Sequence, residues 1–421
     1  MSTVHVSRSG WAAITLVGAL PWLIVVWLLG RPPSPPLPTA AQASPAATAS
    51  AKAAALPARD DYVLGAPGPW GRIRSTRILI EPPADFIPTY FSTPQPLRWT
   101  FPGFTPAQLD SLWDQARLSS EQRAALSGPA HCAVEPAGIV VAPPASLVLG
   151  LSPEARAIIY AVLARFPQNI PQREPFRSRV EMVDEWLDGE AIPPAVVALT
   201  RRLLYRRETN FLLSDHDLVL PHFNSSSDRV AYIKTLARKS ALLAELVIPR
   251  ASAAEIEPIS RYWSHGRRTK DIGPILESLA QRPHGGTLDL VHLLPPFARN
   301  LLYTYPVSTG ADSDNSRDCH WTSFNFFNPR PDERFLDVSH VLRVLAQDYY
   351  LASGSPMMGD LLLFIDERGQ GIHSCVYIAD NIVFTKNGAS FSIPWLLANL
   401  ENVVAFYSLN GPVEVRRYRL R

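Results

Sequence analysis

Three short apolar runs near residue 370 constrain the fold of this chain more than any other feature. They cover residues 361–365, 372–378 and 382–385, and residues that favour turns separate them at 366–371 and 380–381. Short apolar runs divided by tight turns are typical of neighbouring antiparallel strands. The segment therefore predicts a three-stranded meander, in which side chains two apart along a strand share one face.

A histidine in the second run and a cysteine about fifty residues before it form a candidate catalytic pair. Asp314, Asn315, Ser316 and Asp318 are all candidate N-cap residues, and they place Cys319 in the first turn of a helix that we expect to extend to Phe327. Backbone N–H groups of a first turn stabilise a thiolate, and the N–H of Cys319 itself can donate to an oxyanion. His373 lies on the strand of 372–378, where it can meet a cysteine on a helix packed across that face and accept its proton.

A third polar residue is expected to orient this histidine. Thr385 and Asn387, at the end of the third run, are the candidates. Each residue alone is also compatible with a structural role, because cysteine is often buried and a lone histidine on a strand is commonly a core residue. The order of Cys319 and His373, on a helix and then on a strand, favours thiol catalysis over that alternative.

The motifs around this pair resemble those of the NlpC/P60 cysteine peptidases. The matching segments are 318–319 (DC), 356–364 (PMMGDLLLF) and 373–380 (HSCVYIAD). The resemblance covers about residues 290–400. It implies a papain-like core in which a helix packs on an antiparallel sheet. It also implies cleavage of amide bonds in peptidoglycan stem peptides, with a cysteine nucleophile, a histidine base and a third polar residue.

The resemblance implies further site residues and has departures. A tyrosine upstream of the cysteine often supports the oxyanion site in this family, and Tyr305 matches it better than Tyr303. Bulky His320 and Trp321 follow the DC pair where small residues are usual, which narrows or redirects the cleft. Thr385 stands where a second histidine is common, so the substrate of such a divergent member is open.

Two other functions stay open. The same core could carry an acyltransferase or transglutaminase-like activity, with Asp380 following Cys319 and His373 in the order of such a triad. A non-catalytic binding or scaffold protein of the cell envelope is the other alternative. The sequence predicts a peptide or peptidoglycan substrate, no cofactor, no metal site and no nucleic-acid partner.

The N-terminal part predicts where the protein resides. Residues 11–30 form an apolar segment of about the length that crosses a bilayer, with tryptophans typical of a membrane interface. We expect an uncleaved transmembrane anchor after a cytoplasmic N-terminus of residues 1–10; a cleavable signal peptide and a buried core helix are the alternatives. Residues 31–60, rich in Pro and Ala, predict a disordered linker. The protein is then expected in a cell membrane, crossing it once, with its folded domains in the periplasm.

Residues 61–285 are expected to be mainly helical, with long proline-rich connections and a strand within 74–80. Apolar residues at helical spacing follow capping or proline-containing signals. The helices are expected to begin at Thr105-Pro106, Ser152-Pro153 and Pro193-Pro194, and a further one to cover 230–247.

Charge and cysteine content exclude some classes of protein. Lys and Arg total 40 and Asp and Glu 38, so the chain has no general attraction for nucleic acid or an anionic surface. Three cysteines cannot all pair within one chain and have no metal-site spacing, so a free thiol is expected. With a cysteine hydrolase domain at 286–421, we expect an α+β protein.

Overall fold

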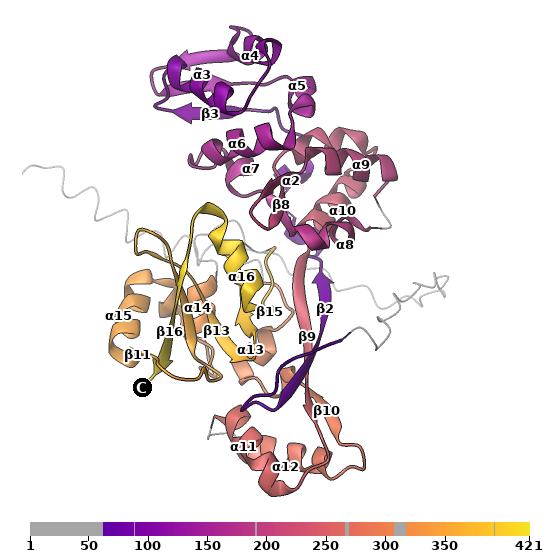
Figure 1. The fold of residues 1–421 in the computed structure, drawn as a ribbon, viewed down its shortest axis with the longest axis vertical. Coiled ribbons are helices and arrows are strands. Elements are labelled where there is room, and N and C mark those ends of the chain that lie inside the picture. Colours follow the sequence, from indigo (N-terminus) through magenta and orange to yellow (C-terminus); the bar gives the residue numbers. More distant parts are fainter. Residues whose placement is uncertain (1–61, 88, 190–191, 266–268, 307–316, 391) are drawn as a thin grey trace, which may run out of the picture. The chain divides into compact units, whose positions relative to one another are not determined.

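A six-stranded antiparallel sheet in the last third of the chain carries most residues of the predicted site. Its strands lie in the order β11-β16-β12-β13-β14-β15. The structure is a computed structural model that describes residues 62–421 except 88, 190–191, 266–268, 307–316 and 391 (Figure 1). The strands are β11 (Tyr349–Leu351), β12 (Leu361–Ile365), β13 (Gly371–Ala379), β14 (Ile382–Thr385), β15 (Leu396–Asn399) and β16 (Glu414–Leu420).

The predicted meander is confirmed. β12 and β14 have the expected bounds, and β13 is one residue longer at each end. The sequence did not predict β11, β15 or β16. Of these, β16 pairs with β12 from Leu361↔Tyr418 to Ile365↔Glu414. β12 therefore lies inside the sheet, and all five of its residues are buried.

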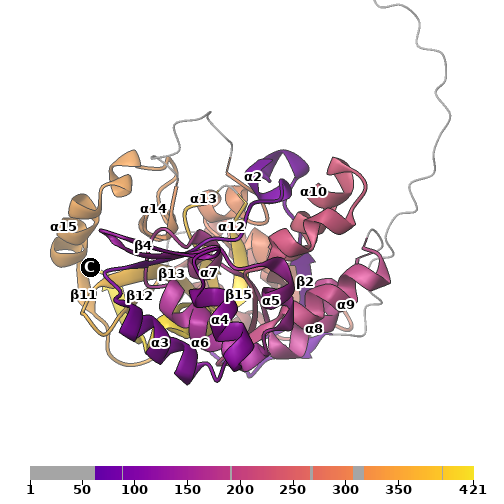
Figure 2. The same cartoon turned by 90° about the horizontal axis from the view of Figure 1, so that it is seen from above.

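Helices cover both faces of this sheet. α14 (Cys319–Phe324) contacts β13 and β14 on one face, where Val376 belongs to a large buried cluster. α16 (Leu400–Tyr407) packs on the other face, in a second cluster that contains Cys375. Both views show α15 (Val338–Asp348) beside β11 (Figures 1 and 2). Successive residues of β13 therefore point alternately to α14 and to α16.

A second antiparallel sheet, with the order β1-β2-β9-β10, precedes this part of the chain. Its strands are β1 (Val63–Leu64), β2 (Arg72–Ile80), β9 (Lys239–Ile248) and β10 (Gly286–Asp289). β2 and β9 run side by side from Arg72↔Val247 to Ile80↔Lys239 (Figure 1). The predicted domain boundary between residues 285 and 286 falls inside this sheet, and contacts group residues 59–421 into one compact unit.

The segment between β2 and β9, residues 81–238, is called the inserted module below. Two buried clusters are centred in it, one around Trp113 and one around Trp186. Its strands form the sheets β3-β5-β4 and β6-β8-β7. The strands are β3 (Trp99–Pro102), β4 (Cys132–Glu135), β5 (Gly138–Val141), β6 (Phe176–Arg179), β7 (Tyr205–Arg207) and β8 (Asn210–Leu213). The helices of the module are α2 (Thr89–Ser92), α3 (Pro106–Gln115), α4 (Ser120–Ser127), α5 (Ala145–Gly150), α6 (Pro153–Leu163), α7 (Ile170–Arg173), α8 (Val183–Leu187), α9 (Pro194–Leu203) and α10 (Ser226–Ala237). Three further helices follow the module: α11 (Ala253–Ser264), α12 (Thr269–Ala280) and α13 (Pro296–Leu301).

Three of the four helix predictions are confirmed. α3 and α6 begin after Thr105 and Ser152, whose side chains cap a backbone N–H three residues on, and α9 begins at Pro194. The helix predicted over 230–247 is wrong in its second half, because α10 ends at Ala237 and a strand follows. The middle region thus contains strands as well as helices. The described chain is α+β, with 42% helix and 24% strand.

The prediction of a membrane-spanning chain is corrected. No helix within the described part of the chain is long and apolar enough to cross a bilayer. The longest α-helices described have 12 residues, about 18 Å, whereas the hydrocarbon core is about 30 Å thick. The structure thus contradicts the transmembrane helix and, with it, the single-pass membrane location and periplasmic placement. Residues 11–30 and the linker at 31–60 lie outside the described residues.

Candidate active site

Cys319 is the first residue of α14 and lies against β13. Asp318 caps this helix, because its Oδ1 accepts the backbone N–H of Trp321 at 2.8 Å. The carbonyl oxygen of Cys319 accepts a hydrogen bond from Ser374 Oγ at 3.3 Å. The backbone N–H of Ser374 favours the charged form of the Cys319 thiol. The cysteine is therefore fixed beside the residue that follows His373 on the strand.

Burial determines the acidity of this thiol. Only 6% of Cys319 is exposed, and burial together with the negative charge of Asp318 raises its pKa to about 12. The N–H of Ser374 and the charge of Lys386 favour a lower pKa but are outweighed. The prediction that the first-turn position lowers the pKa of this cysteine is therefore wrong for the resting site, where the thiol is neutral at pH 7.

His373 is fully buried and is held by two rings and a hydrogen bond. Its imidazole stacks on Tyr407 of α16 with 4.1 Å between ring centroids, and Phe364 lies edge-on to it at 5.1 Å. Its Nε2 lies 3.1 Å from Thr385 Oγ1, which donates in turn to Asn387 Oδ1 at 2.9 Å. The two candidate orienting residues thus form one hydrogen-bonded chain behind the histidine.

The direction of this chain fixes the tautomer of His373. Because the Thr385 hydroxyl gives its hydrogen to Asn387, its oxygen accepts from Nε2, and Nε2 carries the ring hydrogen. Nδ1 is then an acceptor, and it is buried with no hydrogen-bond partner among the described residues. Burial, and to a smaller extent His320, hold the pKa of His373 well below its usual range. The site therefore contains a neutral imidazole with one free basic nitrogen.

Cys319, on α14, lies against β13, the strand that carries His373, but the two residues are not hydrogen-bonded to each other. Ser374 contacts Cys319 on the α14 face, whereas His373 stacks on Tyr407 of α16, as adjacent strand residues must. The sequence predicts that Cys319 and His373 meet on one face of the sheet. In the structure, Cys319 lies on the α14 side and His373 on the α16 side. The Cys319 sulfur makes no hydrogen bond to Nδ1 of His373, which has no partner among the described residues. Proton transfer thus requires the thiol and the imidazole to come together, as catalytic groups often do only when substrate binds.

The upstream tyrosines make no contact with this cluster in the described structure. Tyr305 lies edge-on to Phe86 at 5.9 Å, and its hydroxyl has no hydrogen-bond partner among the described residues. Tyr303 donates its hydroxyl to the carbonyl oxygen of Leu242 in β9. The role of Tyr305 at an oxyanion site stays a prediction without a contact in its favour.

Asp380 lies at the opposite end of β13 from His373. It occupies the turn before β14, seven residues after the histidine, and a strand rises about 3.3 Å per residue. Its carboxylate lies against Gly65, where a Cβ would overlap it. The geometry therefore favours Thr385 and Asn387 over Asp380 as partners of the histidine.

Lys386 lies close enough to Cys319 to act on its charge, and it was not predicted as part of the candidate site. Its buried ammonium donates to the carbonyl oxygens of Gly388 at 2.6 Å and Ser390 at 3.1 Å. Burial lowers the pKa of Lys386 to about 8, and its charge favours the thiolate of Cys319. The sequence offered one signal for this role, because Lys386 directly follows Thr385, a candidate third polar residue.

His320 and Tyr407 were also not predicted as parts of the cluster. His320 Nδ1 lies 2.9 Å from Ser374 Oγ, so this ring helps to hold the serine that contacts Cys319. Tyr407 comes from a helix well after the last motif, and only the fold brings it to His373.

The chain has no match among protein-family models, curated protein sequences or solved structures. The resemblance to NlpC/P60 peptidases therefore stays a prediction based on three short motifs. The chemistry of Cys319 and His373 has to be inferred from their geometry.

Proposed function

We propose that residues 286–421 act as a thiol hydrolase that cleaves amide bonds in peptides. The supporting observation is the buried Nδ1 of His373, which has no hydrogen-bond partner among the described residues. His373 directly precedes Ser374, the residue that contacts Cys319. Leaving a buried polar atom unpaired costs about 1–3 kcal/mol, which a purely structural histidine would not require. A general base needs such a free lone pair, and in this site the imidazole and the thiol must first come together, because they lie towards opposite faces of β13.

In this reaction His373 acts first as a base and then as an acid. As the Cys319 sulfur attacks the carbonyl carbon, the thiol proton moves to Nδ1 of His373. The imidazolium then gives this proton to the nitrogen of the leaving amine, and a thioester bond replaces the amide bond. Water attacks the thioester with the same imidazole as base, which releases the acid and restores the thiol. Thr385 accepts the Nε2–H throughout and keeps Nδ1 as the reacting nitrogen.

The resting pair in this mechanism is neutral, because the pKa of Cys319 is raised to about 12 and that of His373 is held low. Proton transfer therefore accompanies attack and does not precede it. The charge of Lys386 favours the thiolate as it develops.

Peptides of the cell wall are the proposed substrates, as the motif resemblance implies. His320 is in contact with Ser374 beside the thiol, so it leaves less room at Cys319 than a small residue would. A short, extended peptide meets this restriction better than a folded protein does.

A peptide-binding protein without catalysis is the second candidate, and burial of the pair favours it. Only 6% of Cys319 and none of His373 is exposed, so neither can reach a bound peptide until the cluster opens. Such a protein would hold a peptide and leave its amide bonds intact.

Mass spectrometry of stem peptides incubated with the purified chain separates the two candidates. Cys319→Ala should lower the cleavage rate at least about 10³-fold, because it removes the nucleophile. Cys132→Ala is the matched control, since it removes another free thiol, in β4 of the inserted module, and should leave the rate unchanged. Equal cleavage by wild type and Cys319→Ala would refute the hydrolase, and binding without cleavage by both would favour the second candidate.

A further inference from the structure

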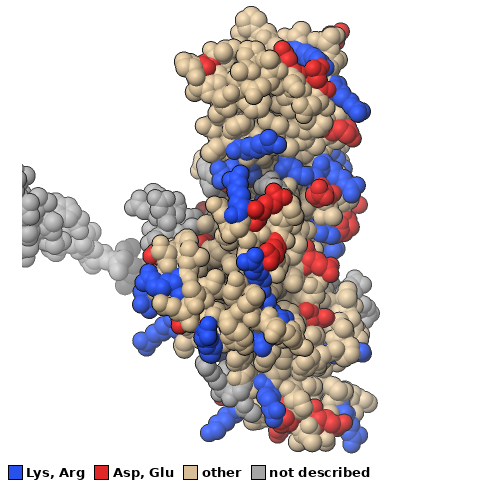
Figure 3. Space-filling view, turned by 60° about the vertical axis from the view of Figure 1, so that its left-hand side comes forward, with Lys and Arg blue, Asp and Glu red and all other residues tan. Residues whose placement is uncertain are grey.

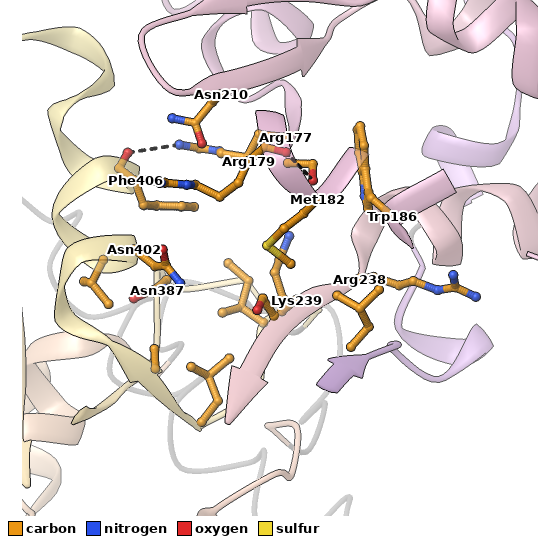
Figure 4. Close-up of a pocket in the computed structure, with 17 residues that line it drawn as sticks. Arg177, Arg179, Met182, Trp186, Asn210, Arg238, Lys239, Asn387, Asn402 and Phe406 are labelled. Carbon is orange, nitrogen blue, oxygen red and sulfur yellow. Dashed lines mark hydrogen bonds between the residues drawn. The ribbon is translucent and has the colours of Figure 1, made fainter. Parts of the chain in front are cut away.

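A cavity of about 100 Å³ lies where β6 of the inserted module, β9 and α16 meet. Asn387 also lines it, from the end of β14 (Figure 4). Four cationic side chains line the cavity, and no carboxylate is among the described residues that do so. The cations are Arg177, Arg179, Arg238 and Lys239.

Two of these cations already have carboxylate neighbours. Arg179 pairs with Glu181 at 2.8 Å. Arg238 lies 3.6 Å from Glu81, and Figure 4 shows its guanidinium directed away from the other labelled side chains. The uncompensated charge at the cavity therefore comes from the other two.

Within the described chain, neither Arg177 nor Lys239 forms an ion pair with a carboxylate, although the more distant charge of Glu174 favours the charged form of Arg177. The guanidinium of Arg177 lies 3.7 Å above the ring of Phe406 and donates to the carbonyl oxygen of that residue at 3.2 Å. No hydrogen bond or ion pair from the described residues reaches the ammonium of Lys239. Burial lowers the pKa of Arg177 to about 10, and burial together with the charge of Arg177 lowers the pKa of Lys239 to about 8. Two neighbouring, poorly hydrated cations that lack an ion-paired carboxylate destabilise the fold, and a bound anion reduces that penalty.

The lining of the cavity differs in charge from the surface that Figure 3 shows. Figure 3 shows Lys and Arg interspersed with Asp and Glu on the surface in view, and the whole chain has a formal net charge of only +2. A generally basic protein would collect cations at many sites by chance, and this chain is not basic in that sense.

We propose that the cavity binds a small oxyanion, a carboxylate or phosphate group, between Lys239 and Arg177. A guanidinium offers paired donors to such a group, and an ammonium adds a compact charge. Asn387 lines the cavity and accepts the hydrogen bond of Thr385, so the anion would lie at the far end of the chain that orients His373. The proposal rests on the cavity alone and does not depend on the hydrolase activity.

Calorimetric titration of the full chain with inorganic phosphate and with acetate, at pH 7 and constant ionic strength, tests this site. At least one of the two anions should bind, and Lys239→Met should weaken binding at least 10-fold while it preserves an unbranched side chain. Arg238→Met is the matched control, because this arginine lines the same cavity but is directed elsewhere; it should change the affinity less than two-fold. Circular dichroism should show that both variants are folded.

Two peptides that differ only in a free or an amidated C-terminus identify the source of the anion. If only the free acid displaces the bound anion, the site takes a peptide carboxylate; if neither peptide does, it takes a free anion. The absence of binding for both phosphate and acetate would overturn the proposal, as would equal affinities of wild type and Lys239→Met. Neither readout requires cleavage.

Discussion

The imidazole of His373 and the phenol ring of Tyr407 lie nearly parallel, with 16° between their planes. This contact restricts rotation of the base, so Tyr407→Leu should lower kcat about 10-fold with little change in KM. Tyr407→Phe keeps the ring and should retain most of the activity. Steady-state kinetics on a stem peptide measure both variants, and equal losses would show that stacking does not position the histidine.

Thr385 should keep His373 in the tautomer that carries its hydrogen on Nε2, because the threonine hydroxyl accepts that hydrogen bond. Thr385→Val removes the acceptor of Nε2–H, so kcat should fall about 10- to 100-fold and the free energy of unfolding by about 1–3 kcal/mol. Thr385→Ser retains the hydroxyl and should preserve both. Kinetics and urea unfolding of the two variants provide the measurement; a wild-type kcat in Thr385→Val would contradict the role of the hydrogen-bonded chain.

The acid limb of the pH–rate profile should lie below pH 6.5. His373 must be neutral to accept the thiol proton, and burial holds its pKa well below the ordinary value. Activity is therefore present above this lowered pKa and is lost only when the pH falls through it. We expect kcat/KM to be constant between pH 7 and pH 6.5. An acid limb centred above pH 6.5 would argue against a buried histidine base.

Lys239 should destabilise the protein when no anion is bound. Its folded pKa of about 8 lies below the ordinary 10.5. Burying the neutral amine above pH 10.5 therefore carries no charge penalty, and the stability of the folded state is lost progressively as the pH falls from 10.5 towards 8. Lys239→Met should therefore be more stable than wild type at pH 7, by about 2 kcal/mol. Urea unfolding should show this difference shrinking between pH 8 and pH 10.5; a constant difference would contradict the charge penalty.

Asp360, within the GDL motif, should contribute more to stability than to chemistry. Its buried carboxylate accepts two hydrogen bonds from Arg419, at 2.6 and 2.7 Å, and lies 3.5 Å from Arg417. Asp360→Asn leaves these arginines of β16 without their counter-charge and should cost about 2–4 kcal/mol in urea unfolding. Glu414→Gln breaks an exposed ion pair in the same strand and should leave stability unchanged. Similar stabilities of the two variants would show that Asp360 does not anchor β16.

Local signals were sufficient for the elements around the motifs but not for long-range pairing. Turn residues bound β12 and β14, and Asp318 caps α14 at the predicted position. Lys239–Ile248 contains three Leu and two Ala, which favour helix, but it forms a strand because it pairs with β2 far earlier in the chain. That pairing has no local signature.

The same distinction applies to the site. The order of the motifs identified Cys319, His373, Thr385 and Asn387, and the structure places them around one end of β13 and β14. The face on which each side chain lies, and the burial that raises the pKa of Cys319, depend on how α14 and α16 pack. A sequence pattern does not specify either packing.

The ribbon of β2 and β9 places residue 80 beside residue 239, so the inserted module leaves and re-enters the fold at a single point. A tight turn could join the two strands there and leave the sheet beneath the thiol intact. Evolution can thus exchange the module as a unit. Replacing the module would remove Arg177 but keep Cys319 and His373, so that the proposed anion site and the proposed thiol site can change independently of each other.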